Sequence, residues 1–143
     1  MTALVDERGR PLPVPSDLTR PFWDALRERR LVLQHCPACG GYQHAPKLRC
    51  TTCRSTELVW REVAGTGRVH SHTTVHRPPS PAFADAVPYV VAIVELDGTG
   101  VRMLSNVVGV PPDDVYIGQK VRVVFDDVAD EFTVFRFEPA EES

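Results

Sequence analysis

Cys36-Pro37-Ala38-Cys39 and Cys50-Thr51-Thr52-Cys53 contain all four cysteines of a chain of 143 residues, and ten residues separate the two motifs. Two residues between a pair of thiols allow a tight turn to direct both sulfur atoms at one metal ion, and four thiolates complete a tetrahedral zinc shell. A complete shell leaves no position for water or a substrate. The spacing therefore predicts a structural Zn²⁺ site with four ligands: Cys36, Cys39, Cys50 and Cys53.

Paired cysteines have two other common uses besides zinc binding. Disulfide bonds need an oxidising compartment, and the stretch that follows Met1 has no apolar run of the kind that a signal peptide contains. A redox Cys-x-x-Cys normally opens a helix in a βαβ unit, and no such pattern surrounds either motif. No stretch has the length of a membrane span. We therefore expect a cytoplasmic protein that does not bind membranes.

The residues that flank the cysteines predict short strands. Leu31-Val32-Leu33-Gln34 leads into the first motif, and Leu58-Val59-Trp60 follows the second. Gly40 and Gly41 are expected to supply the positive φ angles after the first motif. A segment this small buries little apolar surface, so metal binding has to contribute folding free energy, on the order of 10 kcal/mol. The pattern indicates a rubredoxin-like zinc ribbon.

Before the ribbon, the sequence predicts a proline-rich extended arm over residues 1–18 and then a helix of about three turns from Thr19. Phe22 and Trp23 fall on one face of this helix together with Leu26 and Arg30. These aromatic residues either pack on the body of their own domain or anchor another subunit. The sequence favours neither interpretation.

After residue 65 the apolar residues alternate with a period of two, which is typical of strands. Five strands are too few for a comfortable two-sheet sandwich, and closing them into a barrel removes the exposed edges. A five-stranded Greek-key barrel of the OB type fits this count. The strands are expected at 67–76, 89–96, 101–108, 120–125 and 132–137, with an exposed acidic tip formed by Asp126, Asp127, Asp130 and Glu131, and a loose acidic tail over 138–143.

The predicted fold is therefore mainly β with an N-terminal helix. We expect an arm and helix over residues 1–35, a zinc ribbon over residues 36–60 and an OB-fold barrel over residues 61–143. The charge differs between the two ends of the chain. Residues 1–60 contain nine Lys and Arg against six Asp and Glu, whereas residues 61–143 contain seven against thirteen.

This charge distribution bears on nucleic-acid binding, since zinc ribbons and OB folds commonly occur together in proteins that bind single strands. Such binding needs a basic groove with stacking aromatic residues. The predicted barrel has a net charge of −6, which repels phosphate groups. A single-stranded nucleic-acid-binding module is kept as the alternative function.

Histidines are the remaining candidates for chemistry. His70, His72 and His76 are predicted on one face of a strand, where imidazoles could hold a metal or transfer protons. No matching carboxylate accompanies them, so a polar outer face is the simpler interpretation. The sequence has no nucleophile elbow and no phosphate-binding loop. If the histidine face nevertheless acts in catalysis, the chain would be a small hydrolase or aldolase, which is the third hypothesis for its function.

The order of these motifs resembles the zinc-ribbon/OB-fold family of acyl-CoA-associated proteins, which was long labelled a domain of unknown function. The resemblance extends over about residues 17–138. Its motifs are Pro21-Phe22-Trp23, Leu31-Val32-Leu33-Gln34, Cys36-x-x-Cys39-Gly40, Cys50-x-x-Cys53, Gly65-x-Gly67-x-Val69, Tyr89 to Leu96 and Ile117-Gly118-x-x-Val121.

The resemblance implies a non-catalytic subunit of a hetero-oligomer. Members accompany thiolase-like enzymes, which include acyltransferases, hydroxymethylglutaryl-CoA pathway enzymes and retro-aldolases of steroid side-chain breakdown. Some are fused to hotdog-fold enoyl-CoA hydratases or pair with them. The resemblance implies acyl-CoA at a site shared with the partner. Candidate contacts with the partner or acyl-CoA are Phe22, Trp23, Arg30, Arg68, Arg77 and Phe83.

Overall fold

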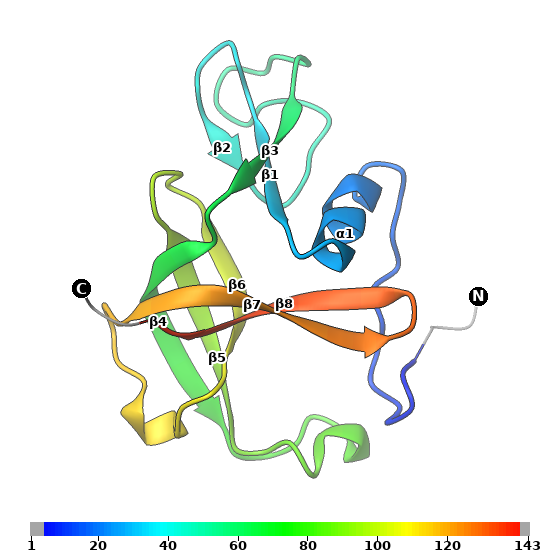
Figure 1. Cartoon of the computed structure of the whole chain (residues 1–143), viewed down its shortest axis with the longest axis vertical. Helices are drawn as coiled ribbons and strands as arrows, with labels where there is room; N and C mark the ends of the chain where they lie inside the picture. The colour runs from blue at the N-terminus through cyan, green and yellow to red at the C-terminus, as the bar shows by residue number, and fades with distance from the viewer. Residues whose placement is uncertain (1–4, 141–143) are drawn as a thin grey trace.

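The computed structural model describes residues 5–140 as a small sheet above a barrel, with one helix beside their junction (Figure 1). The first four residues of the predicted arm and the last three of the predicted tail lie outside the described residues. In chain order the elements are α1 (Arg20–Arg27), β1 (Leu31–His35), β2 (Tyr42–Gln43), β3 (Val59–Val63), β4 (Thr66–Val75), the 3₁₀ turn η1 (Pro81–Phe83), β5 (Tyr89–Leu96), β6 (Arg102–Val107), the 3₁₀ turn η2 (Pro112–Asp114), β7 (Lys120–Ala129) and β8 (Phe132–Pro139).

The first sheet is the ribbon. Its strand order is β2-β1-β3, and both pairings are antiparallel. Leu31 pairs with Val63 at one end of β1, and His35 pairs with Tyr42 and Val59 at the other. The two predicted strands that flank the cysteine motifs are thus confirmed. The second of them, β3, continues to Val63, beyond its predicted end at Trp60.

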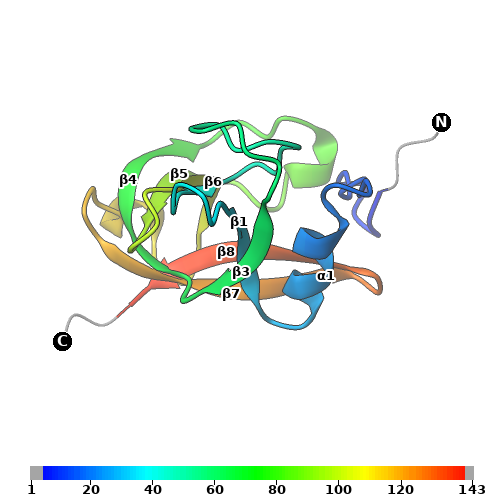
Figure 2. The same ribbon diagram turned by 90° about the horizontal axis from the view of Figure 1, so that it is seen from above.

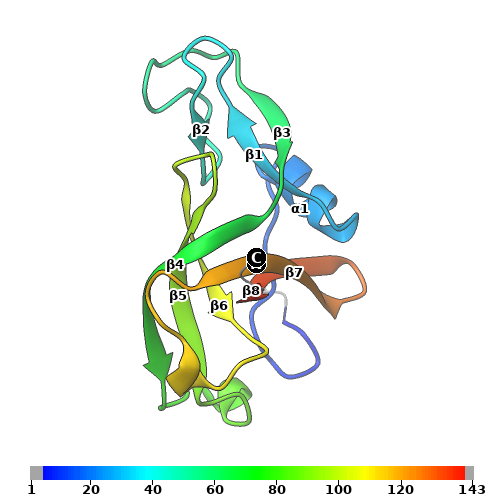
Figure 3. The same ribbon diagram turned by 60° about the vertical axis from the view of Figure 1, so that its left-hand side comes forward.

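The second sheet closes into a five-stranded barrel with the order β4-β5-β6-β8-β7. Strands β4 and β7 pair in the antiparallel sense, and β6 meets β8 in the parallel sense at Val107 and Phe137. This is the Greek-key arrangement of an OB fold, so the predicted fold class is confirmed. Figure 3 shows β3 of the ribbon running directly into β4 of the barrel.

The last hairpin is longer than the sequence predicts. Strand β7 continues to Ala129, so Asp126 and Asp127 lie within a strand, and only Asp130 and Glu131 lie at the tip. The prediction of a four-residue acidic tip was wrong. Both aspartates form ion pairs, Asp126 with Arg136 and Asp127 with Arg29. From the sequence pattern alone, their charges are expected to be solvated.

Helix α1 has eight residues, about two turns, and packs against β1 and β8 (Figure 2). Its buried residues are Phe22, Ala25 and Leu26. The Phe22 ring meets the Phe135 ring of β8 edge to face, at 5.8 Å between centroids. One apolar core therefore runs from the helix through β1 into the barrel.

Gly65 and Gly67 join the ribbon to the barrel at a place where a side chain would not fit. Gly65 has a φ of +77°, and a Cβ atom there would collide with the side chain of Val123. A Cβ atom on Gly67 would collide with the carbonyl oxygen of Glu95 in β5. Glycine is required here because the backbone enters the barrel in close contact with two of its strands.

The described part of the arm is tied to the barrel. The Arg10 guanidinium stacks over the Phe83 ring at 5.0 Å and forms an ion pair with Asp85 at 3.0 Å. Its Nε atom donates a hydrogen bond to the carbonyl of Ala82. The arm therefore fixes the loop that contains η1. Within residues 5–140, no helix has both the length and the apolar character needed to cross a membrane.

Candidate metal centre

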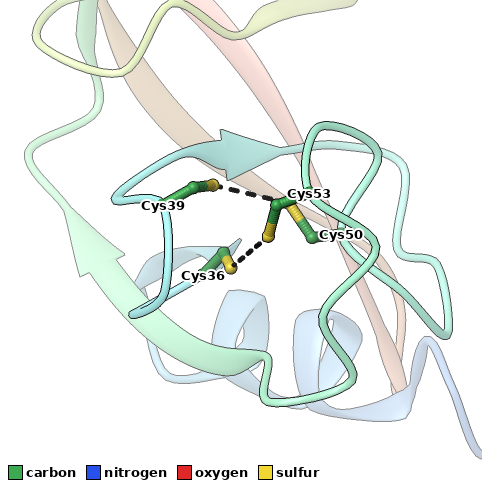
Figure 4. A group of neighbouring side chains, drawn as sticks. All are labelled: Cys36, Cys39, Cys50 and Cys53. Carbon is green, nitrogen blue, oxygen red and sulfur yellow. Dashed lines mark hydrogen bonds between the residues drawn. The ribbon is translucent and has the colours of Figure 1, made fainter.

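The four thiols meet between the two loops of the ribbon (Figure 4). All four Sγ atoms lie within 4.8 Å of one another. Two pairs link the motifs, Cys36 with Cys53 at 3.5 Å and Cys39 with Cys50 at 3.6 Å. Zinc–sulfur bonds of about 2.3 Å in a tetrahedron place the sulfur atoms roughly 3.8 Å apart. The separations and the all-thiol donor set therefore fit a structural zinc ion.

The two cysteine motifs have the same backbone hydrogen bonds. The first motif closes with bonds from Gly40 N–H to Cys36 C=O and from Cys36 N–H to Gly41 C=O. The second closes in the same way, from Arg54 N–H to Cys50 C=O and from Cys50 N–H to Ser55 C=O. We call these turns, residues 36–41 and 50–55, the first and the second knuckle.

One backbone position in each knuckle has a positive φ angle, +79° at Gly40 and +66° at Arg54. The prediction of positive φ was correct for Gly40 and wrong for Gly41. A Cβ atom on Gly41 would lie 3.4 Å from the Cys39 sulfur, so this glycine provides space beside a ligand. Arg54 was missed, although it holds the position that corresponds to Gly40.

The pKa values of two of the thiols are shifted in opposite directions. The N–H groups of Cys53 and Thr52 lower the pKa of Cys50 to about 6. The Ser55 N–H lowers the pKa of Cys53, but the neighbouring thiols, that of Cys36 foremost, outweigh it and raise the value to about 11. Zinc binds the thiolate form, so the ion would favour loss of the proton from both thiols.

The ligands differ in exposure. Cys36 and Cys50 are buried, whereas Cys39 and Cys53 are exposed. The two nearby histidines are engaged elsewhere, as the His44 ring packs on Phe22 at 4.9 Å between centroids and the His35 ring packs on Tyr42 at 4.6 Å. Burial lowers the pKa of His44. Neither imidazole is needed to complete the shell.

Phe22, a predicted contact for a partner or acyl-CoA, is only 3% exposed. Its ring packs inside the molecule against Phe135 and Trp23, so it offers no surface to another molecule. The partner-contact prediction for Phe22 was therefore wrong, because the helix uses this side chain to bind its own barrel. Trp23 is partly buried and packs at the border of the core.

The other predicted contacts are spread over the molecule. Arg30 is exposed and pairs with Glu28 at 3.2 Å and Glu62 at 3.5 Å. Arg68 is exposed and donates to the carbonyl of Gly118 at 3.0 Å. Arg77 is exposed beside the proline-rich loop. Phe83 lies under Arg10 and lines a cavity of about 290 Å³ together with Tyr89, Asn106, Val107 and Arg136.

The predicted histidine face is interrupted by a β-bulge. Along β4 and β5, Val69 pairs with Val94, but Ser71 pairs with Ile93 and His72 with Ala92, so the register shifts at His70. Cross-strand partners share a face of the sheet. His72 thus lies on the same face of the sheet as its partner, the buried Ala92. The prediction that His70 and His72 share one strand face was therefore wrong.

Two arginine–aspartate pairs were not expected from the sequence. Arg29 donates to both carboxylate oxygens of Asp127, at 2.9 and 2.6 Å, and so connects the end of the helix to β7. This guanidinium, together with the Thr133 hydroxyl, lowers the pKa of Asp127 to about 2. Arg136 binds Asp126 at 2.9 Å in the same hairpin.

Comparison with known proteins gives two family profiles that match adjacent segments. Residues 23–59 match the ChsH2 rubredoxin-like zinc ribbon domain, and residues 60–126 match the ChsH2 C-terminal OB-fold domain. A solved chain of the Ltp2-ChsH2(DUF35) aldolase is 39% identical and superposes with a TM-score of 0.81, over 91% of this chain and all of that one.

Two kinds of curated relative are similar in sequence. A DUF35 domain-containing scaffold protein of Methanothermobacter thermautotrophicus is 36% identical over 76% of this chain and 82% of its own length. A probable enoyl-CoA hydratase alpha subunit of Thermomonospora curvata is 43% identical over 83% of this chain. The 3-oxo-4,17-pregnadiene-20-carboxyl-CoA hydratase alpha subunit of Mycobacterium tuberculosis is 34% identical over 93% of it.

The chain spans only 37% and 45% of the lengths of these two hydratase subunits, whereas it spans most of the scaffold protein and the whole of the aldolase chain. The order of zinc ribbon and OB barrel, the four thiols and the identities agree with one another. The chain belongs to the DUF35 family of zinc-ribbon/OB-fold proteins, of which the ChsH2 ribbon and barrel domains are representatives.

Proposed function

We propose that this chain is a non-catalytic accessory subunit of a complex with a thiolase-like enzyme that acts on acyl-CoA thioesters. One observation carries the proposal. The chain matches, at 39% identity and a TM-score of 0.81, the full length of a chain in an Ltp2-ChsH2(DUF35) aldolase. The match covers ribbon and barrel together, so it concerns the arrangement of both parts and not the fold of one.

The chemistry of the described residues supports an accessory role. The four thiols fill a closed shell, which leaves no position for a reacting molecule. The β-bulge at His70 shifts the register between His70 and His72, two of the histidines that the third hypothesis combines. The Methanothermobacter relative is named a scaffold protein, which agrees with a role in assembly.

The partner surface is also proposed. Trp23 and Phe83 remain the aromatic candidates, since both are partly exposed and lie outside the ribbon. Three apolar side chains on the barrel are further candidates, since Leu104, Tyr116 and Ile117 are exposed by 67%, 52% and 69%. Large exposed apolar residues are the usual centres of protein–protein interfaces.

The experiment is co-expression with a thiolase-like enzyme of the same organism. We expect the two chains to co-purify and the cleavage of an acyl-CoA thioester to require both. A partner that is soluble and fully active alone would contradict the proposal, as would turnover by the isolated, homogeneous accessory chain.

Substitution of the two tryptophans distinguishes docking from stability. Trp23→Ala is expected to weaken co-purification by at least tenfold, in line with the loss of an aromatic interface residue. Trp60→Ala is the matched control, because Trp60 is also partly buried but lies in the ribbon sheet. Equal losses in both variants would mean that destabilisation, and not a lost contact, explains the result.

A hydratase partner is the second candidate, because the Thermomonospora relative with 43% identity is named as a hydratase alpha subunit. The same co-expression with an enoyl-CoA hydratase subunit tests it. The nucleic-acid alternative predicts a salt-dependent shift of a labelled oligonucleotide at physiological ionic strength. We expect none, because residues 61–143 carry a net charge of −6.

A further inference from the structure

Two glutamines form a buried pair inside the ribbon. Gln34 on β1 and Gln43 on β2 are 4% and 8% exposed and lie opposite each other in the sheet. The Nε2 atom of Gln43 donates to Oε1 of Gln34 at 2.8 Å. Buried amides are costly unless their donors and acceptors are satisfied. The partners of these two side chains therefore indicate what the pair does.

Both glutamines bind the backbone of the segment between the knuckles. Gln34 accepts from Lys47 N–H at 2.9 Å and donates to Lys47 C=O at 2.9 Å. Gln43 donates to Arg49 C=O at 3.2 Å and accepts from Thr51 N–H at 2.9 Å and from the Thr51 hydroxyl at 3.2 Å. The backbone donors and acceptors fix which way each amide points, because a reversed amide would face like against like.

The second knuckle depends on these bonds for its position. The first knuckle is part of the hairpin that joins β1 to β2, whereas residues 44–58 form no regular element. Across the described residues 5–140, the hydrogen bonds that connect 44–56 with 31–43 all involve Gln34 or Gln43, apart from the contacts between thiols. Thr51 lies between Cys50 and Cys53, so Gln43 contacts the knuckle itself.

We propose that the Gln34–Gln43 pair positions the second knuckle for the metal, so that Cys50 and Cys53 are held close to the first two thiols. The pair acts on zinc through the backbone and touches no ligand sulfur. Outer-shell partners of this kind typically contribute a factor of 10 to 100 in metal affinity. The pair therefore raises zinc affinity and does not merely stabilise the ribbon.

The test measures Zn²⁺ affinity of the full-length, zinc-loaded protein by competition with a chromophoric chelator. Gln43→Met keeps the approximate length of the side chain and removes its hydrogen bonds. We expect a ten- to hundredfold loss of affinity and, after replacement of zinc by Co²⁺, a changed absorption spectrum in the visible range. Gln119→Met is the matched control, since Gln119 is a buried glutamine of the barrel that accepts from Tyr116 N–H. Its affinity and cobalt spectrum should equal those of the wild type.

A second variant removes the other partner of the hydrogen bond between Thr51 N–H and Gln43, in case Gln43→Met does not fold. Thr51 corresponds to Pro37 in the first knuckle, so Thr51→Pro introduces a residue that this turn accepts and removes the N–H that Gln43 binds. We expect at least a tenfold loss of zinc affinity, and a smaller loss for Thr51→Val, which keeps the N–H. Wild-type affinity and cobalt spectrum in Thr51→Pro, or in a folded Gln43→Met, would overturn the proposal.

Discussion

The ribbon and the barrel differ in what they bury. Between residues 36 and 58 the fully buried residues are Cys36, Gln43 and Cys50, so this part of the ribbon has no fully buried aliphatic or aromatic side chain. The barrel encloses residues such as Met103 and Phe137, which are 1% and 0% exposed. The comparison indicates that ligand bonds and hydrogen bonds specify the outer ribbon, while apolar burial specifies the barrel.

The largest expected effect is loss of the metal. Cys36→Ser, or treatment of the wild type with a strong chelator, should remove on the order of 10 kcal/mol of metal-dependent stabilisation. Hydrogen exchange followed by mass spectrometry should then show rapid exchange over residues 36–58 and continued protection of β5 and β6. The barrel serves as an internal control. Protection of the ribbon in metal-free wild-type protein would contradict the distinction between the two parts.

The second largest expected effect is a loss of barrel stability on substitution of a core residue. Phe137 is fully buried between the barrel strands and its ring contacts Phe135 at 6.1 Å between centroids. Phe137→Ala should lower the free energy of unfolding by about 3–5 kcal/mol, because it leaves a cavity in a packed core. Denaturant unfolding measures the loss.

Zinc content separates this result from a general loss of structure. In the folded fraction of Phe137→Ala, we expect one zinc per chain, as in the wild type, because the side chain does not support the knuckles. Loss of zinc in proportion to loss of barrel stability would show that the two parts unfold as one unit. The shared core at α1 and β1 makes this a demanding test.

The cysteine spacing and the apolar alternation were sufficient to predict the zinc site and the five-stranded barrel, because both are local patterns. Features set by contacts between distant residues were not predicted. The bulge at His70 depends on the register that β5 imposes. Within the extension of β7, Asp126 and Asp127 pair with Arg136 and Arg29, which no spacing rule connects to them.

The burial of Phe22 also depends on a contact between distant residues that the sequence does not show. The sequence shows an amphipathic helix but does not show which surface receives its apolar face. Strand β8 provides that surface through Phe135, and Phe22 is buried there. The apolar face of α1 is therefore buried against the barrel of its own chain, although the neighbouring ribbon is small.

A smaller effect concerns the ion pair that joins the helix end to the barrel. The pKa of Asp127 is lowered from 3.8 to about 2, first by Arg29 and then by Thr133. Because the folded state holds this carboxylate ionised, the stabilisation is complete above pH 4 and is lost as the pH falls from about 4 to about 2. Asp127→Asn should therefore reduce the fall in thermal stability over this range.

The matched control is Glu131→Gln, at the tip of the same hairpin, since Glu131 forms no ion pair among the described residues. Its acid profile should follow that of the wild type. Identical profiles for Asp127→Asn and the wild type would mean that the exposed Arg29–Asp127 pair contributes nothing measurable, as many surface pairs do. The helix would then be held to the barrel by apolar contacts alone.

The smallest effect distinguishes the two knuckles. Gly40 and Arg54 hold corresponding positions with φ angles of +79° and +66°, but only glycine adopts this conformation without steric cost. Arg54→Gly should raise the free energy of unfolding of the zinc-loaded protein by about 0.5 kcal/mol, since relief of roughly 1 kcal/mol of strain is partly offset by the greater freedom of glycine in the unfolded chain. Gly40→Ala should lower it by about 1 kcal/mol.

Thermal unfolding of both variants at saturating zinc gives the comparison. The backbone carbonyl of residue 54 accepts a hydrogen bond from the Arg49 guanidinium, and Arg54→Gly preserves it. A gain for Arg54→Gly with a loss for Gly40→Ala would establish that the knuckles share one backbone requirement, which the second meets with a strained residue. A loss in both variants would instead mean that the Arg54 side chain makes a contact worth more than its strain, and the knuckles would then differ in side-chain support as well as in sequence.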